Sequence, residues 1–567
     1  MTDLLETRCL SSLTKVFADE ELTAEPYSAG SALKKETYSF QVAYRAALLI
    51  KSVEVNASSP INARISLRAV GLAPSELPYL QNSDEHVLRK TPGLFPDPLY
   101  PIHPEDGIAA LPGQWRSVWV TVEPDRDVKP GKYDIHILFQ NAEGKLIGSE
   151  TFELDIVGAS LPKQQLIHTE WLHTDCLATY YGLDVFSEPH WQMIERYIET
   201  AVRHGINMTL TPLFTPPLDT AIGGERPTVQ LIDVEKHGDS YHFSFGKLKR
   251  WVEMCNRLGV EYFEFSHLFT QWGAKHAPKI MAEEDGVRRK IFGWETDAGG
   301  PEYLGFLGQF LPELVKFTRQ HGLEKRCYFH NSDEPRGGDL EQYQKLSRFT
   351  RQYLDPYPII DALSDYSFYE QGAVKIPVPA SNHIEPFIEH QVRPLWTYYC
   401  VSQRVNTSNR FFNIPSARNR IIGIQLYKFD AAGFLHWGYN FWYSQYSKRP
   451  LNPFVQTDAS HAFPSGDAFL VYPGAGGPIE SLRMEVFYEA LQDLRALRLL
   501  ESFIGREEVM ALLEGDLQTP ITFSEYPRSE AWLLAKREQI NRLIAANHSR
   551  FCEASAEQRT ETAAGGV

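Results

Sequence analysis

Two adjacent carboxyl side chains, Asp333 and Glu334, mark the part of the sequence best suited to acid and base chemistry. They follow an apolar segment beginning at Arg326, whose last residues turn abruptly polar, and they precede Pro335. Two carboxyl groups can divide the roles of proton donor and charge stabiliser. Successive residues of a strand point to opposite faces, so both side chains reach one pocket only where strand geometry ends. Pro335 marks that point, and we expect it to hold Glu334 at extended backbone angles.

The alternative for an isolated Asp-Glu-Pro is a solvated loop or the start of a helix. Its neighbours argue against that interpretation. His330 and Asn331 add side chains able to hydrogen-bond a ligand or to tune a carboxylate. Asp339 stands ahead of the next helical stretch and can cap it, so Asp333 is not needed for that role. We therefore expect a functional site around Asp333 and Glu334.

The elements that must position this pair alternate strand and helix from residue 164 onward. Eight candidate strands lie at residues 166–174, 206–214, 262–269, 326–332, 359–365, 374–379, 394–400 and 433–441. Helical periodicity between several of them predicts a (β/α)8 TIM-type barrel over residues 164–475. Barrels carry their functional groups at the carboxyl ends of their strands, which is where Asp333 and Glu334 follow the fourth candidate strand.

The segments on either side of the barrel have different patterns. Short alternating strands between about residues 36 and 157 predict an N-terminal β-sandwich domain over residues 1–160. Amphipathic stretches at Ser481–Ser502 and about Glu530–Asn547 predict a C-terminal helical extension, residues 476–553, packed on the barrel. Residues 554–567 are expected to be a disordered tail. The predicted fold class is therefore multidomain β plus α/β, with sandwich, barrel and C-terminal helices in that order.

Composition excludes several classes of function. The 56 basic and 72 acidic residues give a net charge of −16 without a long basic block, which disfavours nucleic acid and anionic membrane surfaces.

No apolar run approaches the ~18 to 20 residues of a bilayer span, and the first residues lack the apolar region of a secretory signal. Six widely spaced cysteines fit free thiols, so we predict a cytoplasmic protein. No metal-ligand spacing or nucleotide-binding glycine motif is found, so neither metal nor cofactor is predicted.

Two parts of the sequence resemble a known family. The segment His330-Asn-Ser-Asp-Glu-Pro335 resembles the adjacent Asp-Glu motif of family 123 glycoside hydrolases, which are β-N-acetylgalactosaminidases. Three downstream segments resemble the domain of unknown function 4091, which forms the C-terminal part of such proteins: Gly433-Phe-Leu-His-Trp-Gly-Tyr-Asn-Phe-Trp442, Gly466-Asp-Ala-Phe-Leu-Val-Tyr-Pro-Gly474, and Ser481-Leu-Arg-Met-Glu485 with Asp493. With the order of the domains, the resemblance covers roughly residues 36–500.

The resemblance implies a carbohydrate substrate and a substrate-assisted retaining mechanism. In that mechanism the 2-acetamido oxygen of the sugar attacks the anomeric carbon, so no nucleophile from the protein is needed. Glu334 would then protonate the leaving oxygen and later activate water. Asp333 would orient the acetamido N–H and stabilise the oxazolinium-like cation.

Aromatic and amide side chains near the strand ends are candidates for binding the sugar. Aromatic rings stack on pyranose faces, although each of these residues could equally belong to the barrel core. Asn440 could bind ring hydroxyls, and Tyr366 could hold the acetamido oxygen. The aromatic candidates are Trp171, Trp396, Tyr398 and Trp437.

Two other functions stay open. A conventional glycosidase would pair Glu334 with a second carboxylate about 5 Å away on another strand. The candidates for that second group are Glu170, Asp175, Glu264 and Asp365. The chain could instead be a carbohydrate-binding relative without turnover, but binding alone would not require two neighbouring carboxyl groups. The sequence leaves the oligomeric state open.

Overall fold

The computed structural model describes residues 5–103 and 105–564, with side chains through residue 550. The chain divides into two compact units. The first contains Met1–Gln164, Arg410–Lys428 and Ile479–Val567, and the second contains Gln165–Asn409 and Phe429–Pro478. This division differs from the sequence prediction, which assigns residues 410–428 to the barrel and packs the C-terminal helices on it. The structure groups both segments with the N-terminal strands.

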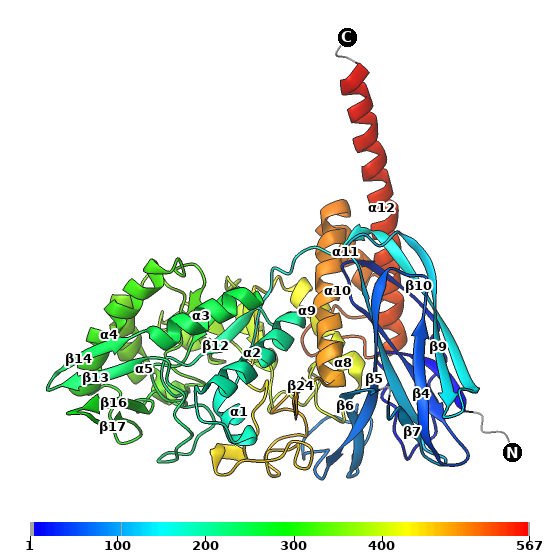
Figure 1. Ribbon diagram of the computed structural model, residues 1–567. Helices are drawn as coiled ribbons and strands as arrows, with labels where there is room; N and C mark the ends of the chain where they lie inside the picture. The colour runs from blue at the N-terminus through cyan, green and yellow to red at the C-terminus, as the bar shows by residue number, and fades with distance from the viewer. Residues whose placement is uncertain (1–4, 104, 565–567) are drawn as a thin grey trace. The chain divides into compact units, whose positions relative to one another are not determined.

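Two five-stranded sheets form the N-terminal part of the first unit (Figure 1), in the orders β1-β3-β8-β5-β6 and β2-β10-β9-β4-β7. Phe40 and Val120 from one sheet and Ile137 and Phe152 from the other are buried in one shared core. Alternating apolar residues of both sheets thus meet, as the predicted sandwich requires. The strands are β1 Glu6–Ser11, β2 Ala29–Lys34, β3 Tyr38–Arg45, β4 Ile50–Ser58, β5 Ala63–Ser75, β6 Gly93–Pro101, β7 Ile108–Ala110, β8 Arg116–Pro124, β9 Gly131–Asn141 and β10 Leu146–Ser160.

Helices complete the first unit. Helix α10 (Leu482–Ile504) packs against α8 (Ser416–Arg420), α9 (Ile422–Lys428), α11 (Arg506–Glu514) and α12 (Glu530–Ala564). The apolar stripe predicted for core packing in α10 is buried, which confirms that interpretation: Phe487, Ala490, Leu491, Leu494 and Leu497. Helix α12 includes residues 554–564, where the sequence predicts disorder, while residues 565–567 lie outside the described part of the chain.

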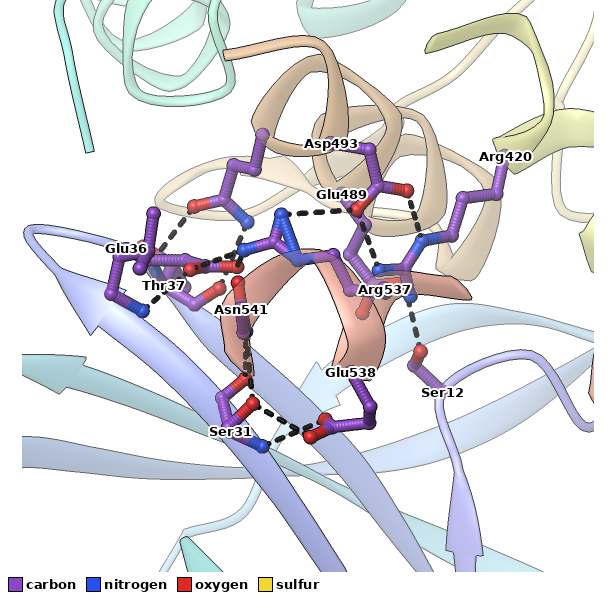
Figure 2. Close-up of polar contacts among 12 residues, drawn as sticks. Ser12, Ser31, Glu36, Thr37, Arg420, Glu489, Asp493, Arg537, Glu538 and Asn541 are labelled. Carbon is purple, nitrogen blue, oxygen red and sulfur yellow. Dashed lines mark hydrogen bonds and ion pairs between the residues drawn. The ribbon is translucent and has the colours of Figure 1, made fainter. Parts of the chain in front are cut away.

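Buried ion pairs tie these helices to one another (Figure 2). The Arg420 guanidinium contacts both Asp493, at 2.7 Å, and Glu489, at 2.8 Å. Arg537 of α12 lies 3.5 Å from Asp493 and 2.6 Å from the Glu36 carboxylate. A buried charge is tolerated only where such partners replace its hydration. Asp493 belongs to the third of the downstream segments singled out in the sequence. In the structure its carboxylate is a partner of two buried arginines in the first unit.

Eight parallel strands of the second unit lie at the eight predicted places. Six form a sheet in the order β18-β15-β12-β11-β22-β21, and β19 and β20 form a separate parallel pair. Isolated parallel bridges join Phe329 to Ile359 and Ala380 to Tyr398. The structure thus shows a parallel sheet and a strand pair where the sequence predicts one continuous barrel. The strands are β11 Ile167–Glu170, β12 Met208–Thr211, β15 Tyr262–Phe265, β18 Cys327–Tyr328, β19 Ile360–Ala362, β20 Ile376–Val378, β21 Trp396–Tyr398 and β22 Gly433–His436.

Helices follow most of these strands (Figure 1), as expected for βα units. They are α1 Thr174–Tyr181, α2 Glu188–Arg203, α3 Gly246–Leu258, α4 Pro301–Gln320, α5 Leu340–Leu354, α6 Tyr366–Glu370 and α7 Glu385–Glu389. An additional four-stranded sheet, which the sequence did not predict, contains β13 Asp233–His237, β14 Ser240–Ser244, β16 Ile280–Glu284 and β17 Val287–Phe292. None of the helices among the described residues is both long and apolar enough to cross a membrane.

Candidate active site

A cavity of about 200 Å³ opens at the carboxyl ends of the parallel strands of the second unit. Its lining residues lie at the ends of β19, β21 and β22, follow β11, β21 and β22 closely, or lie on the longer loops after β12, β15, β18 and β22. Aromatic and apolar side chains line it together with three acidic residues. The carboxyl groups belong to Asp219, Asp333 and Glu334, and the aromatic rings to Trp171, Trp272, Tyr398, Trp437, Tyr446 and Phe463.

Asp333 and Glu334 share this cavity because the backbone turns sharply between them. Glu334 has a φ of +45°, in the left-handed region that a residue with a side chain rarely adopts. The expectation that Pro335 keeps Glu334 extended is therefore wrong. The Glu334 N–H donates to the Ala362 carbonyl at 2.9 Å, and the Asp333 carbonyl accepts from the Trp272 N–H at 2.8 Å. These bonds to neighbouring strand ends offset the cost of the turn.

The Tyr398 hydroxyl orients the carboxyl group of Glu334. It donates to Glu334 Oε1 at 2.6 Å, a short bond typical of a donor facing a carboxylate. Burial, followed by the charge of Glu334, raises the pKa of Tyr398 well above its ordinary value. The phenol consequently stays protonated and remains a donor.

Burial, together with the adjacent charge of Glu334, raises the pKa of Asp333 well above the ordinary value of an aspartate. The nearby His330 acts in the opposite direction. Two carboxyl groups that share a poorly hydrated site cannot both ionise cheaply, which is the physical reason for the raised pKa of Asp333. This is the electrostatic arrangement that acid and base catalysis requires.

His330 lies beneath the cavity and does not line it. Its Nε2 is 2.6 Å from Glu264 Oε1, and its Nδ1 is 3.4 Å from Asp361 Oδ1. Burial by itself would lower the pKa of His330, but the hydrogen bonds to Asp361 and Glu264 raise it to about 9. The ring stacks on His267 with centroids 4.2 Å apart. His330 is therefore a buried residue bonded to two carboxyl groups and is not part of the cavity lining.

Two further aromatic candidates, besides Tyr398, line the cavity. The Trp171 indole N–H donates to Glu264 Oε1 at 2.7 Å, which fixes the ring against the cavity. The Trp437 indole N–H donates to Asp467 Oδ2 at 3.2 Å. Both rings are thus held by a carboxylate outside the cavity while they line it.

The two amide candidates point elsewhere. Asn331 accepts a hydrogen bond from Thr350 of α5 at 3.0 Å, so its side chain faces the helix layer. Asn440 holds the backbone of His173, with bonds of 2.8 Å and 3.1 Å. Neither lines the cavity, because these bonds hold their side chains against other parts of the chain.

Trp396 and Tyr366 also lie outside the cavity. Trp396 is buried among the apolar residues inside the strand layer, directly over Gly433, where a Cβ would come within 2.2 Å of the indole. Tyr366 begins α6 and stacks on His390 with centroids 4.8 Å apart. Trp396 is thus core, and Tyr366 covers a neighbouring helix.

The four carboxylates considered as partners for Glu334 do not line the cavity, whereas one that the sequence did not suggest does. Asp219 lies on the loop after β12, and burial raises its pKa to about 6. Its Oδ2 accepts the Tyr446 N–H at 3.0 Å. The sequence carries no motif at Asp219, and only the fold brings this loop to the site. Among the described residues, no group of three or more His, Cys, Asp or Glu side chains could hold a metal ion.

Comparison with known proteins identifies the family to which this chain belongs. The family model for the glycoside hydrolase 123 catalytic domain matches residues 171–500. A family 123 glycoside hydrolase from Clostridium perfringens that acts in glycolipid glycan hydrolysis has a TM-score of 0.72 and 16% identity, covering 98% of this chain and 100% of that chain. An endo-β-1,4-mannanase from Thermotoga petrophila has a TM-score of 0.34 and 13% identity, covering 59% and 77%. None of the curated proteins compared matches the sequence.

Parallel strands that present neighbouring carboxyl groups in an aromatic cavity, together with this family match, define the class: the protein is a glycoside hydrolase. The family model covers more than half of the chain, so the chain belongs to glycoside hydrolase family 123. The matched range contains residues 330–335, which confirms the resemblance to family 123 found in the sequence.

Proposed function

We propose that this protein is an exo-acting, retaining β-N-acetylgalactosaminidase that uses the 2-acetamido group of its substrate. The observation that supports this most is the placement of Asp333 and Glu334 in one small cavity, with Tyr398 bonded to Glu334. The cavity volume of about 200 Å³ lies below the ~300–1,000 Å³ of sites for drug-sized ligands, which favours one sugar residue over a chain. We further propose that the eight parallel strands act as one (β/α)8 barrel, supported by the two isolated bridges.

The first chemical step would need one proton on the carboxyl pair, and the raised pKa of Asp333 favours retention of that proton. Asp333 would accept a hydrogen bond from the acetamido N–H, which favours the state with the proton on Glu334. The acetamido oxygen then attacks the anomeric carbon while the bond to the leaving oxygen breaks and Glu334 protonates that oxygen. The product is an oxazolinium-like ring whose positive charge faces the Asp333 carboxylate.

The second step would reverse the role of Glu334. As a carboxylate it takes a proton from water, whose oxygen attacks the same anomeric carbon and reopens the ring. Two inversions at one carbon give net retention. Tyr398 keeps Glu334 aimed at one position throughout, because its hydroxyl bonds the same Oε1.

A conventional double displacement is the second candidate, and Asp219 is the observation in its favour. Of the carboxylates that line the cavity, Asp219 comes from a different strand end than Glu334, as a nucleophile on a retaining glycosidase does. In that mechanism Asp219, and not the acetamido group, would attack the anomeric carbon.

Aryl glycosides with and without the acetamido group separate the two mechanisms. We expect hydrolysis of 4-nitrophenyl N-acetyl-β-galactosaminide and loss of this activity in Asp333→Asn and Glu334→Gln, with little hydrolysis of the plain β-galactoside. Equal rates on both substrates would refute substrate assistance. A covalent glycosyl adduct on Asp219, trapped with a 2-fluoro sugar and located by mass spectrometry, would support double displacement.

A further inference from the structure

One aromatic residue of the cavity lining, Trp272, is much more exposed to solvent than two others. Trp272 is 37% exposed, whereas Trp171 is 2% and Tyr398 7% exposed. An indole that lines a cavity and also faces solvent lies at its rim.

Trp272 is held rigidly with respect to the carboxyl pair. Its backbone N–H donates to the Asp333 carbonyl at 2.8 Å. Trp272, Gly273 and Ala274 have successive φ values of +57°, +116° and +54°. At Gly273 a Cβ would lie 2.7 Å from Asp339 Oδ1, so the loop is pressed against the start of α5. Residues with side chains adopt such φ values at a cost, and proteins retain this strain mostly at functional sites.

Tyr446 completes a two-ring platform with Trp272. The rings meet edge to face, with centroids 5.7 Å apart at 89°. Tyr446 has a φ of +62°, its N–H donates to Asp219 Oδ2 at 3.0 Å, and its carbonyl accepts the Ala221 N–H at 3.1 Å. Two loops from distant parts of the sequence are thus fastened so that both rings border the same opening.

We propose that Trp272 and Tyr446 form the subsite for the leaving group of the substrate, and that this subsite takes a second pyranose ring. The proposal rests on the proposed function. A cavity of about 200 Å³ has room for the sugar whose bond is cleaved, so the leaving residue must pass the rim. The apolar face of a pyranose is the surface that an exposed indole next to Asp333 can cover.

The test compares substrates that differ only in the leaving group. One is a β-linked disaccharide with N-acetylgalactosamine at its non-reducing end, and the other is N-acetyl-β-galactosaminyl fluoride, whose leaving group is a single atom. The variants are Trp272→Ala, Trp272→Phe and Tyr180→Ala. Tyr180 is a matched control, because it is 38% exposed and does not line the cavity.

We expect Trp272→Ala to lower kcat/KM for the disaccharide by about 10- to 100-fold, and by at least about tenfold more than for the fluoride. Trp272→Phe should restore much of the disaccharide activity, and Tyr180→Ala should resemble the wild-type protein on both substrates. Equal losses on both substrates in Trp272→Ala and in Trp272→Phe would overturn the subsite while leaving the proposed function standing. If the wild-type protein hydrolyses neither substrate, the proposed function itself is refuted.

Discussion

Replacing Asp333 by Asn should make the protein less active and, at neutral pH, more stable. Burial and the charge of Glu334 raise the pKa of Asp333 in the folded state well above its value in the unfolded chain, which is about 3.9. Such a group contributes stability that is fully present below the unfolded pKa and is lost as the pH rises toward the folded pKa. Asn has nearly the same shape but cannot ionise, so the variant does not suffer this loss.

The magnitude follows from proton linkage. Between the two pKa values the folded state binds one more proton than the unfolded state, so wild-type stability falls by at most about 1.4 kcal/mol per pH unit relative to the variant. The difference in unfolding free energy should therefore grow from pH 4.5 upward and level off once the pH passes the folded pKa. Over the same range kcat should fall by about 100- to 1,000-fold, because the stabilising charge near the acetamido group is gone.

Urea unfolding of both proteins at several pH values, followed by tryptophan fluorescence, measures this difference. Glu195→Gln is a control of opposite sign, because the hydrogen bond from Arg257 lowers the pKa of Glu195. That carboxylate contributes stability above its unfolded pKa, so its variant should lose stability relative to wild type as the pH rises. A difference for Asp333→Asn that is independent of pH, or that favours wild type at pH 7, would contradict the electrostatic account of the site.

Two further substitutions test other parts of the structure. Tyr398→Phe removes the 2.6 Å hydrogen bond to Glu334 and leaves the shape of the side chain almost unchanged. A hydrogen bond to a charged group contributes about 1.5–3 kcal/mol, so we expect kcat/KM for the aryl glycoside to fall by about 10- to 150-fold. An unchanged kcat/KM would show that Tyr398 does not orient the acid. Asp493→Ala removes one of the two buried carboxylate partners of Arg420 and of Arg537, and it should cost about 3–5 kcal/mol in unfolding free energy, with unchanged KM in the remaining folded enzyme. A loss under about 1 kcal/mol would contradict the structural role of these ion pairs.

Local patterns in the sequence determined the position of each strand and of the carboxyl pair. Short apolar segments between helical stretches located all eight parallel strands, because burial on both faces of such a strand imposes an apolar run on each strand separately. The abrupt change to polar residues after Phe329 located Asp333 and Glu334 at a strand end. The apolar stripe of α10 likewise predicted its buried face.

Direction and proximity, in contrast, were decided only by the tertiary structure. Asn331, Asn440 and Trp396 lie within the predicted strand segments, but which way each side chain points depends on register and on irregular turns, which have no local signal. Asp219 and Trp272 reach the cavity through loops whose left-handed residues are stabilised by bonds to distant segments. A conformation that costs free energy locally and is offset by contacts far along the chain cannot be inferred from the residues beside it.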